Sequence, residues 1–577
     1  MPFNEGSDTM RNWKIAGFTA TAIFVAAFPV YVARMALDKS KAQAEEGALF
    51  VGRNTCIECH KKENDLWLGS HHDLAMDVAN DTTVLGDFSN HEFRHKGKTH
   101  RMFRKDGGFY INTEGPSGAF EDFPVTHTFG YTPLQQYLVP FDGGRLQCLP
   151  IAWDTERGKW FHLGDTVYAG QDVSPDNWLY WTNQAQNWNG MCADCHSTNL
   201  RKNYDPETGT FNTTWSEIDV SCEACHGPAS DHLTWANLPE GSRPADVNTG
   251  LVVRTRDLDN KELLNVCARC HSRRSIMGDY ENDNSDLLNY MIPQLITQPI
   301  YFADGQILDE DYEYGSFTQS KMFEKLVKCS DCHDSHSVKT KEPDNQLCLQ
   351  CHRPDIYDTP RHHFHKPDPG KGKERLINRG EPEYVEGSGA QCVNCHMVGR
   401  YYMGNDYRRD HSFRIPSPAM TLSIGTPNAC NDCHKDKTTA WSQKYMLQWY
   451  GEKTPLHYGE TFAAAQKGDQ SVIPDLILYS GNELFPLMVR ATAVHFLGNL
   501  NTSESNLAVE KALSDPASLV RHTAIMSFNP TDAPSYERLL MPLSVQGHHA
   551  LIDGIHMGRY YGEVEDLLQH PEDVLGE

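Results

Sequence analysis

The sequence is short of positive charge. It holds 52 Lys and Arg residues against 77 Asp and Glu, a formal net charge of -25. A chain that binds nucleic acid needs a basic face for the phosphates, so we expect no nucleic-acid partner. An acidic surface attracts basic proteins or cationic substrates instead, and this attraction weakens as salt is added.

Charge of either sign is missing from residues 15–33, IAGFTATAIFVAAFPVYVA. At 1.5 Å per residue this segment would form a helix of about 28 Å, close to one hydrocarbon core. We therefore expect residues 1–40 to hold a single uncleaved transmembrane signal-anchor. The alternative is a cleaved signal peptide, because KAQA at 41–44 ends in an A-x-A-like pattern.

Cysteine is almost absent outside one pattern. Sixteen of the 17 cysteines fall in eight C-x-x-C-H units, and Cys148 is the exception. We expect Cys148 to be a small buried residue, with a reactive thiol as the alternative. The paired cysteines are Cys56 and Cys59, Cys192 and Cys195, Cys222 and Cys225, Cys267 and Cys270, Cys329 and Cys332, Cys348 and Cys351, Cys392 and Cys395, and Cys430 and Cys433.

The C-x-x-C-H spacing is that of covalent haem attachment. Two thiols add to the vinyl groups of one porphyrin, and the histidine that follows binds the iron. Disulfides and zinc sites also use paired cysteines, but neither explains a histidine after every second cysteine. The sequence therefore predicts eight haem c groups with iron. Their proximal ligands would be His60, His196, His226, His271, His333, His352, His396 and His434.

A second axial histidine is expected wherever an iron only passes electrons. Enough histidines stand near the motifs for eight bis-histidine haems, and each could serve a neighbouring haem. His362 is a further candidate in RHHFH, where it stands beside two of the preferred residues. The candidate distal ligands are His71, His72, His127, His232, His336, His363, His365 and His411.

No motif reads C-x-x-C-K, the lysine variant that marks the catalytic haem of ammonia-forming nitrite reductases. This counts against that enzyme but not against other multihaem reductases. Covalent haem attachment takes place outside the cytoplasmic membrane. Together with the apolar segment, it predicts a single-pass protein of that membrane with residues 40 onward in the periplasm or its equivalent.

Three regions follow the apolar segment. Residues 41–190 hold the first motif and an insert rich in aromatic residues and glycine, in which GFYIN and KWFHL alternate like short strands and hairpins. Residues 191–440 hold seven motifs, dense enough for only short helices and loops around closely packed haems. Residues 441–577 have no cysteine and show helical periodicity. The predicted fold class is mainly α with much irregular loop.

A V-R-x-T-A pattern occurs twice in the last region, at Val489 and Val520, 31 residues apart. This spacing is close to that of helical-hairpin repeats of the HEAT type. It would place Val489, Ala493 and Leu497 on one helix face. We expect either a small helical layer capped on the haem domain or a free solenoid, whose role is to dock a partner or to cover the edge haems.

The motif surroundings resemble the multihaem cytochromes of the cytochrome c-554/c-prime type. The similar segments are CIECHKKENDLWLGSHHDLAM, GRLQCLPIAWD, CADCHSTNL, CEACHGPASDH, and RDHSFRIPSP followed by PNACNDCHKDK. They resemble most the subgroup with TPR or HEAT-like repeats at the C-terminus. The resemblance implies an exported electron-transfer protein with mostly bis-histidine haem, although related families contain enzymes.

The sequence leaves two main functions open, beside a purely structural or sensory haem protein. The first is an electron relay between a quinol-oxidising complex or soluble cytochrome and an outer acceptor, by a membrane-anchored chain that could also form oligomers. The second is an oxidoreductase acting on a small nitrogen or sulfur compound (nitrite, hydroxylamine or tetrathionate class) at a haem with an open axial position. The isolated haem on His60, near the insert residues His100, Arg101 and Arg104, is the first place to look for such a site.

Overall fold

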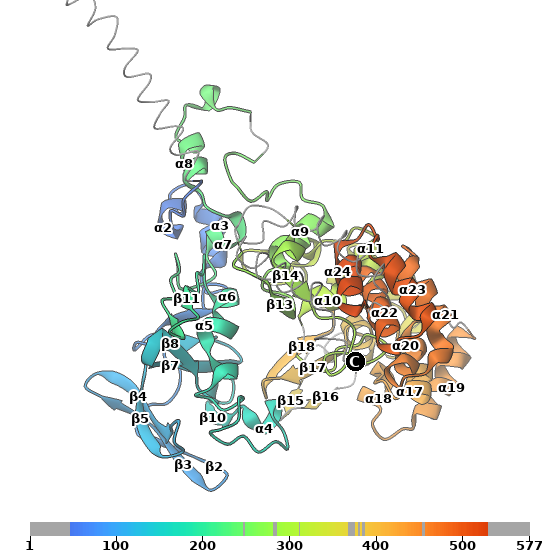
Figure 1. Cartoon of the computed structure of the whole chain (residues 1–577), viewed down its shortest axis with the longest axis horizontal. Coiled ribbons are helices and arrows are strands. Elements are labelled where there is room, and N and C mark those ends of the chain that lie inside the picture. The colour runs from blue at the N-terminus through green and yellow to red at the C-terminus, as the bar shows by residue number, and fades with distance from the viewer. Residues whose placement is uncertain are drawn as a thin grey trace, which may run out of the picture.

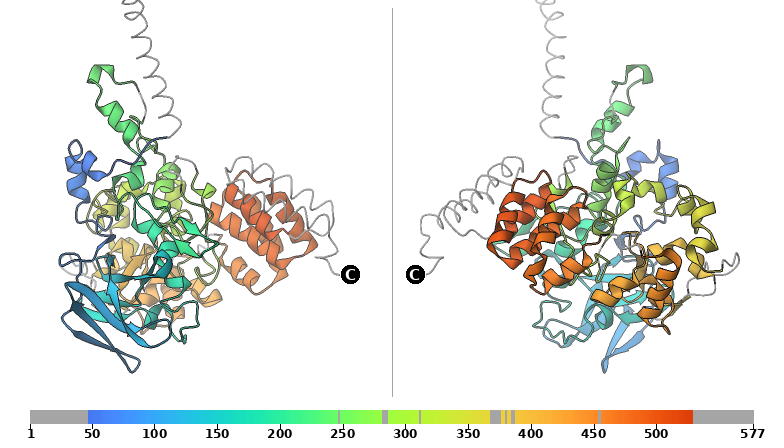
Figure 2. Two further views of the ribbon diagram at one scale, coloured as in Figure 1. Left: turned by 60° about the vertical axis from the view of Figure 1, so that its left-hand side comes forward. Right: turned by 90° about the vertical axis from the view of Figure 1, so that its right-hand side faces the viewer.

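The structure is a computed structural model of the chain. It describes residues 47–245, 248–280, 286–310, 312–366, 376–378, 381–383, 387–452 and 456–528. Two antiparallel sheets and a layer of helices lie on different sides of the molecule (Figures 1 and 2). Helices and strands are therefore both present, and the sheets are larger than isolated hairpins.

The aromatic insert forms the two sheets. One has six strands in the order β1-β6-β7-β9-β10 with β8 paired to β7, and the other is the meander β2-β3-β4-β5. Along β4, buried and half-buried residues alternate, as expected of a strand with one face on a core. The strands are β1 (Met76–Val78), β2 (His91–His95), β3 (Lys98–Lys105), β4 (Gly108–Glu114), β5 (Phe120–Val125), β6 (His127–Phe129), β7 (Leu134–Phe141), β8 (Arg145–Cys148), β9 (Ile151–Asp154) and β10 (Lys159–His162).

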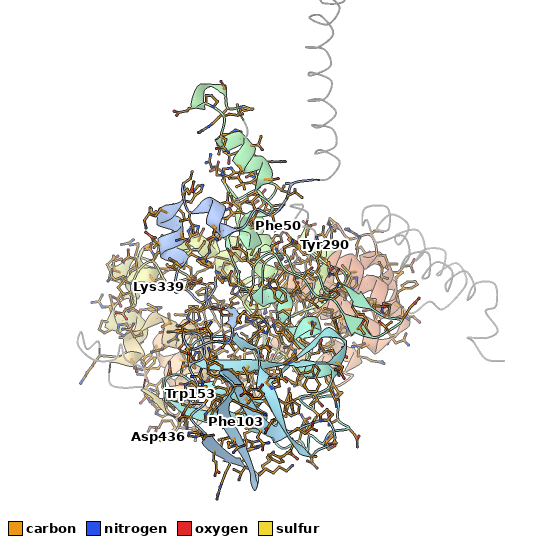
Figure 3. The ribbon with its side chains drawn as sticks, turned by 90° about the vertical axis from the view of Figure 1, so that its left-hand side faces the viewer. Phe50, Phe103, Trp153, Tyr290, Lys339 and Asp436 are labelled. Atoms are coloured by element: carbon orange, nitrogen blue, oxygen red, sulfur yellow. The ribbon has the colours of Figure 1, made fainter. Side chains whose placement is uncertain are left out.

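Local sequence explains the tight turns of the meander. Lys96-Gly97 and Asp106-Gly107 both have positive φ angles and connect β2 to β3 and β3 to β4. Two successive left-handed residues are typical of two-residue hairpin loops. Trp153 and Phe103 are buried in these sheets, at the end of the molecule opposite helix α8 (Ser230–Ala236) (Figure 3).

Short helices carry the motifs, as the motif density predicted. They are joined by loops and by two-stranded hairpins such as β13–β14 (Arg274–Ile276, Met291–Pro293) and β17–β18 (Gly399–Tyr402, Asp406–Arg409). Smaller pairs are β11–β12 (Tyr204–Asp205, Thr210–Phe211) and β15–β16 (Leu376–Asn378, Glu381–Glu383). The helices before residue 435 are α2 (Arg53–Cys56), α3 (Lys61–Trp67), α4 (Gly164–Val167), α5 (Trp188–Met191), α6 (Ala193–His196), α7 (Cys222–His226), α8, α9 (Asn260–Ala268), α10 (Glu313–Phe317), α11 (Lys321–Glu324), α12 (Cys329–Cys332), α13 (Gln346–Leu349), α14 (Pro354–Tyr357), α15 (Pro360–His363), α16 (Cys392–His396), α17 (Pro418–Ile424) and α18 (Ala429–Cys433).

Longer helices follow the last motif. They are α19 (Thr439–Tyr450), α20 (Gly459–Gln466), α21 (Ile473–Gly481), α22 (Leu487–Leu500), α23 (Ser503–Ala512) and α24 (Ser518–Ser527). The V-R-x-T-A segments lie in α22 and α24, which pack against each other. Val489, Ala493 and Leu497 are fully buried on α22, as the periodicity predicted.

One apolar core joins this helical layer to the motif region. It runs from Leu264 on α9 through Ile296 to the buried faces of α20–α24. The backbone N–H of Ile296 also donates to the hydroxyl of Thr492 on α22, at 3.0 Å. The helical layer is therefore docked on the motif region.

The prediction of a single-pass membrane protein is corrected by the structure. Among the residues that the structure describes, no helix combines the length and the apolar character that crossing a bilayer requires. The expected segment, residues 15–33, lies outside the described residues.

Candidate haem-binding sites

Each C-x-x-C-H motif is folded as about one helical turn. The histidine N–H donates to the carbonyl of the first cysteine, for example from His60 to Cys56 at 2.9 Å and from His434 to Cys430 at 2.8 Å. Residues three and four apart in such a turn lie on one side. The local fold therefore directs two thiols and an imidazole toward the same space, as covalent haem attachment needs. We number the motifs 1 to 8 in chain order, from Cys56–His60 to Cys430–His434.

None of the 17 cysteines, all of which lie in the described residues, forms a disulfide. Cys148 is buried on β8, where its sulfur accepts a hydrogen bond from the side-chain amide of Gln136 at 3.1 Å. Burial raises the pKa of the Cys148 thiol. This agrees with the expectation of a small buried residue.

Five motif histidines lie opposite a second histidine. Two imidazoles that bind one iron from opposite sides, each at about 2 Å from nitrogen to metal, have ring centres about 6 Å apart. The observed pairs and centre-to-centre distances are His60 with His232 (6.1 Å), His271 with His72 (6.3 Å), His333 with His411 (6.5 Å), His396 with His362 (6.1 Å) and His434 with His365 (6.1 Å).

Hydrogen bonds of the paired rings fit the same geometry. The Nδ1 atoms of His232, His396 and His411 lie 2.7, 2.8 and 3.0 Å from backbone carbonyl oxygens. A ring that donates from Nδ1 to a carbonyl leaves Nε2 as the metal-binding atom. The residues present therefore fit a haem iron held between two histidines.

Burial keeps several of these rings neutral. It lowers the pKa of His72 and of His226 to about 4, and nearby histidines add to the effect. A neutral imidazole has the lone pair that a metal requires. After burial, His336 is the next cause of the lowered pKa of His226, which indicates that this predicted distal histidine lies near motif 3.

The predicted distal histidines divide into two groups. His72, His232, His365 and His411 each face a motif histidine, and His336 lies near one. His127 contacts the ring of Trp215 instead, at 6.4 Å. His71 and His363 face no motif histidine among the ring contacts of the described residues, and His362 takes the place beside motif 7.

Three motif histidines have no histidine among their ring contacts in the described residues. One of them, His226 of motif 3, has His336 nearby, and the other two contact other aromatic rings. His196 of motif 2 contacts Phe129, with ring centres 4.2 Å apart, and its Nδ1 lies 3.2 Å from the carbonyl oxygen of Ala75. His352 of motif 6 contacts Tyr357, at 5.5 Å. These two motifs, and not motif 1, are the candidates for an axial position without histidine.

The insert residues that the sequence suggested for an open site at motif 1 make contacts within and beside the β2–β5 meander instead. The His100 ring is buried and its Nδ1 lies 2.8 Å from the hydroxyl of Thr113. Arg101 lies over Phe103, and Arg104 lies over Phe109 and pairs with Asp81. With His232 opposite His60, the geometry does not support an open site at motif 1.

Thiols from different motifs lie close together in pairs. In each pair the neighbouring thiol is the first cause of the pKa shift, raising the pKa of one member and lowering the pKa of the other. The pairs are Cys56 with Cys222 (motifs 1 and 3), Cys270 with Cys195 (motifs 4 and 2), Cys267 with Cys329 (motifs 4 and 5) and Cys392 with Cys348 (motifs 7 and 6).

The remaining neighbours complete a continuous series. The Arg269 guanidinium donates to the carbonyl of Ala224 at 3.0 Å, which joins motif 4 to motif 3. Burial, and then the thiol of Cys348, raises the pKa of Cys332, which places motif 5 beside motif 6. Helices α16 and α18, of motifs 7 and 8, are in contact. Motif 4 therefore meets motifs 2, 3 and 5.

One motif histidine, His271, forms a hydrogen bond with a carboxylate. Nδ1 of His271 lies 3.0 Å from Oε2 of Glu313. Burial alone would raise the pKa of Glu313, but the hydrogen bond from His271 and the charge of that ring outweigh it and lower the pKa to about 2.

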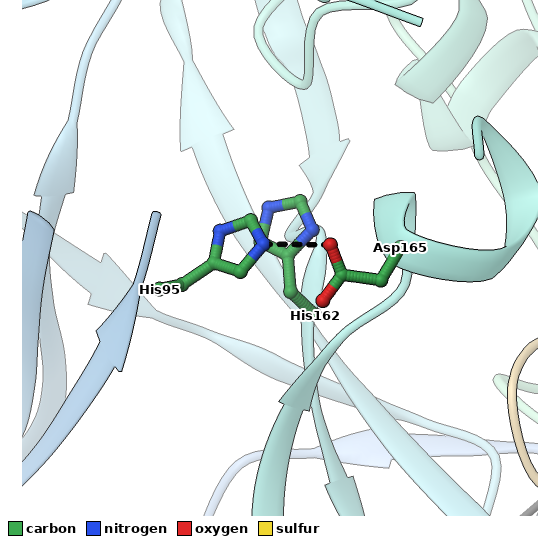
Figure 4. A group of neighbouring side chains, drawn as sticks. All are labelled: His95, His162 and Asp165. Carbon is green, nitrogen blue, oxygen red and sulfur yellow. Dashed lines mark hydrogen bonds and ion pairs between the residues drawn. The ribbon is translucent and has the colours of Figure 1, made fainter. Parts of the chain in front are cut away.

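Another histidine-carboxylate group lies in the insert. His95 Nε2 is 2.8 Å from Asp165, and the rings of His95 and His162 stack at 4.0 Å with 10° between their planes (Figure 4). A metal ion lies in the plane of each imidazole that binds it, which two parallel stacked rings cannot both satisfy. Nδ1 of His162 also accepts the N–H of Gly164 at 3.0 Å. This group therefore ties β2 to β10 and α4 rather than forming a metal site.

Two family models match motif-bearing parts of the chain. The family model described as cytochrome c554 and c-prime matches residues 177–227, and the doubled CXXCH motif matches residues 323–356. The chain is 24% identical over 185 residues to the multiheme cytochrome MtrA of Shewanella baltica (strain OS185), which covers 28% of this chain and 51% of that protein. The chain thus spans about half the length of MtrA.

Two further similarities carry less weight. The outer cell wall cytochrome OcwA superposes with a TM-score of 0.44 at 14% identity, over 85% of this chain and 99% of that chain. A chloramphenicol acetyltransferase of Clostridium perfringens is 45% identical over 40 residues, which is 7% of this chain and 18% of that protein. Neither supports a function here.

Proposed function

We propose that this chain, a multihaem c-type cytochrome, binds eight haem c groups and relays electrons through them. The observation that carries the proposal is the set of five opposed histidine pairs, whose ring centres lie 6.1 to 6.5 Å apart. Each haem would supply an iron that gains and loses one electron reversibly.

The chain's own residues would hold these groups in place. The sixteen motif cysteines tether them and the eight motif histidines bind from one side. Distal binding is assigned to His232 at motif 1, His336 at motif 3, His72 at motif 4, His411 at motif 5, His362 at motif 7 and His365 at motif 8.

The contacts between motifs support an order for the relay. They support a line through motifs 1, 3, 4, 5, 6, 7 and 8, with motif 2 attached to motif 4. Electron transfer falls steeply with distance, so attachment sites that touch favour transfer along this line. The second cysteines of motifs 1 and 6, Cys59 and Cys351, are the exposed motif thiols, which favours exchange with partners there.

The regions on either side of the relay would support it. We assign the relay core to residues 191–440, the first motif and its sheets to 41–190, and a helical cover to 441–577. The net charge of -25 favours basic redox proteins as partners. Their association rate should then fall as ionic strength rises.

Replacing one distal histidine tests the assigned pairs. His411→Ala should convert one haem from low-spin to high-spin in electron paramagnetic resonance spectra, while all eight haems stay attached through their cysteines. His127→Ala is the matched control, because His127 faces Trp215 and should leave every haem unchanged. If His411→Ala also left the spectrum unchanged, the pairing would be wrong.

A second function is favoured by one observation. His196 and His352 contact Phe129 and Tyr357 rather than a histidine, so motif 2 or motif 6 could leave an axial position for a small nitrogen or sulfur compound. The untreated protein would then show a high-spin haem that turns low-spin with cyanide or nitrite. If all eight haems were low-spin and bound neither cyanide nor nitrite, the second function would be excluded and the electron relay would stand.

A further inference from the structure

The hydrogen bond between His271 and Glu313 sets motif 4 apart. Among the other motif histidines, Nδ1 of His196 and of His396 lies near a backbone carbonyl oxygen, and Nδ1 of His60 is 4.0 Å from Glu63. At His271 the acceptor is a carboxylate at 3.0 Å. A charged acceptor binds an N–H more strongly than a neutral carbonyl does.

The backbone fixes Glu313 beside this ring. Glu313 is the first residue of α10, and the N–H of the next residue, Tyr314, donates to the carbonyl of His271 at 3.0 Å. Tyr314 and Phe317 anchor α10 in the apolar core that also contains Leu264 of α9. The carboxylate is thus held to motif 4 through two contacts and a packed helix, rather than by a free side chain.

Motif 4 is also the branch point of the motif series. Its Cys270 contacts Cys195 of motif 2, its Cys267 contacts Cys329 of motif 5, and its Arg269 binds the backbone of motif 3. Any change in the electron affinity at motif 4 would therefore act on every route between motif 2 and the rest of the series.

A carboxylate that accepts the Nδ1 proton of a metal-bound imidazole makes Nε2 more basic. A more basic axial ligand stabilises the oxidised iron more than the reduced iron, so the midpoint potential falls. We propose that Glu313 is a positioning residue that lowers the midpoint potential of the haem on His271 below that of an otherwise equal haem whose histidine donates to a backbone carbonyl. This inference rests on the proposed function, because it requires a haem at motif 4.

Glu313→Gln removes the charge but keeps the size and an acceptor oxygen. We expect the midpoint potential of one haem to rise by about 59 mV. For one electron this equals about a tenfold fall in the ratio of oxidised to reduced iron at a fixed potential. The g-values of the same haem should shift in electron paramagnetic resonance spectra. Spectroelectrochemical titration of the full chain measures the change in midpoint potential. The potentials of the other seven haems should shift by less than that of the haem on His271.

Glu63→Gln is the matched control. Glu63 and Glu313 are similarly exposed (42% and 37%), but Glu63 lies 4.0 Å from its histidine and Glu313 lies 3.0 Å from His271. The control should therefore shift no potential by a comparable amount. Glu313→Asp, which keeps the charge on a shorter side chain, provides a second variant should Glu313→Gln lose haem.

The outcomes separate this inference from the proposed function. Peptide mass mapping of the unchanged protein shows whether a haem is attached at Cys267 and Cys270. If none is attached, the proposed set of eight haems is wrong. If the haem is attached and neither Glu313 variant changes any potential or g-value, the relay stands and the role of Glu313 is overturned.

Discussion

Residues 318–434 and 456–528 are organised in different ways. The first segment carries four motifs, and its buried apolar side chains among the described residues are those of Ala390, Tyr402 and Ala429. The second has no cysteine and buries 21 apolar side chains. Helix α22 alone has ten buried residues, eight of them apolar. Apolar burial is the main favourable term in folding. The helical layer can therefore hold itself together, whereas the motif segment depends on what its cysteines attach.

The largest expected effect comes from preventing haem attachment. Protein made without the haem-attachment machinery should lose structure across residues 318–434, because this segment has few apolar contacts of its own. Residues 456–528 should keep theirs. Hydrogen exchange followed by mass spectrometry would show fast exchange in the first segment and slow exchange in α22 and α24. Equal protection of both segments would contradict the claim that only residues 318–434 depend on attached haem.

A cavity in the helical layer should have the next largest effect. Leu497→Ala removes a fully buried side chain from α22 and should lower the free energy of unfolding of that layer by about 2–5 kcal/mol. Haem content and midpoint potentials should not change. Leu507→Ala on α23 is the control, because Leu507 is 67% exposed, and should cost less than about 0.5 kcal/mol. A variant at Leu497 that also altered the potentials would show that the two regions do not act separately.

A smaller effect concerns a carboxyl group between motifs 2 and 3. Burial and then the charge of Glu217 raise the pKa of Asp219 from 3.8 to about 7, and one of its oxygens has no hydrogen-bond partner among the described residues. The folded chain thus binds this proton more tightly than the unfolded chain does. Stability should fall as the pH rises from about 4 to about 7.

Asp219→Asn should remove that part of the pH dependence and raise the stability by about 1–2 kcal/mol at pH 8. Chemical unfolding of the variant and of the unchanged chain at pH 5 and pH 8 measures both effects. Equal slopes with pH in the two proteins would contradict the assignment.

The smallest effect is expected at an exposed ion pair on α3. Lys61 and Asp65 lie 2.6 Å apart but are 75% and 51% exposed. Lys61→Ala should change the stability by less than about 0.5 kcal/mol in unfolding by denaturant. A fall of more than about 1 kcal/mol in the free energy of unfolding would mean that this ion pair stabilises the motif region more than the exposure of its two side chains indicates.

Local spacing predicted the local structure. The C-x-x-C-H units form helical turns, GFYIN and KWFHL lie in strands β4 and β10, and the V-R-x-T-A segments lie in packed helices. These patterns depend on residues within one element, whose geometry is fixed by the period of a helix or strand. Cys148 was expected to be buried for another reason, because an unpaired cysteine is usually a small buried residue.

Pairing across the chain could not be predicted in this way. His60 and His232 are 172 positions apart, and no spacing rule identifies the histidine that closes the other side of an iron. From the sequence we preferred His363 to His362, although the two are adjacent and only their direction on α15 separates them. Glu313 carries no sequence signal, because its role depends on the contact between α10 and motif 4.

Mass spectrometry of the intact, denatured chain tests the central claim most directly. Thioether bonds survive denaturation, so the account predicts a mass equal to the polypeptide plus eight haems. A mass equal to the polypeptide alone, or one that fell to that value on denaturation, would contradict it.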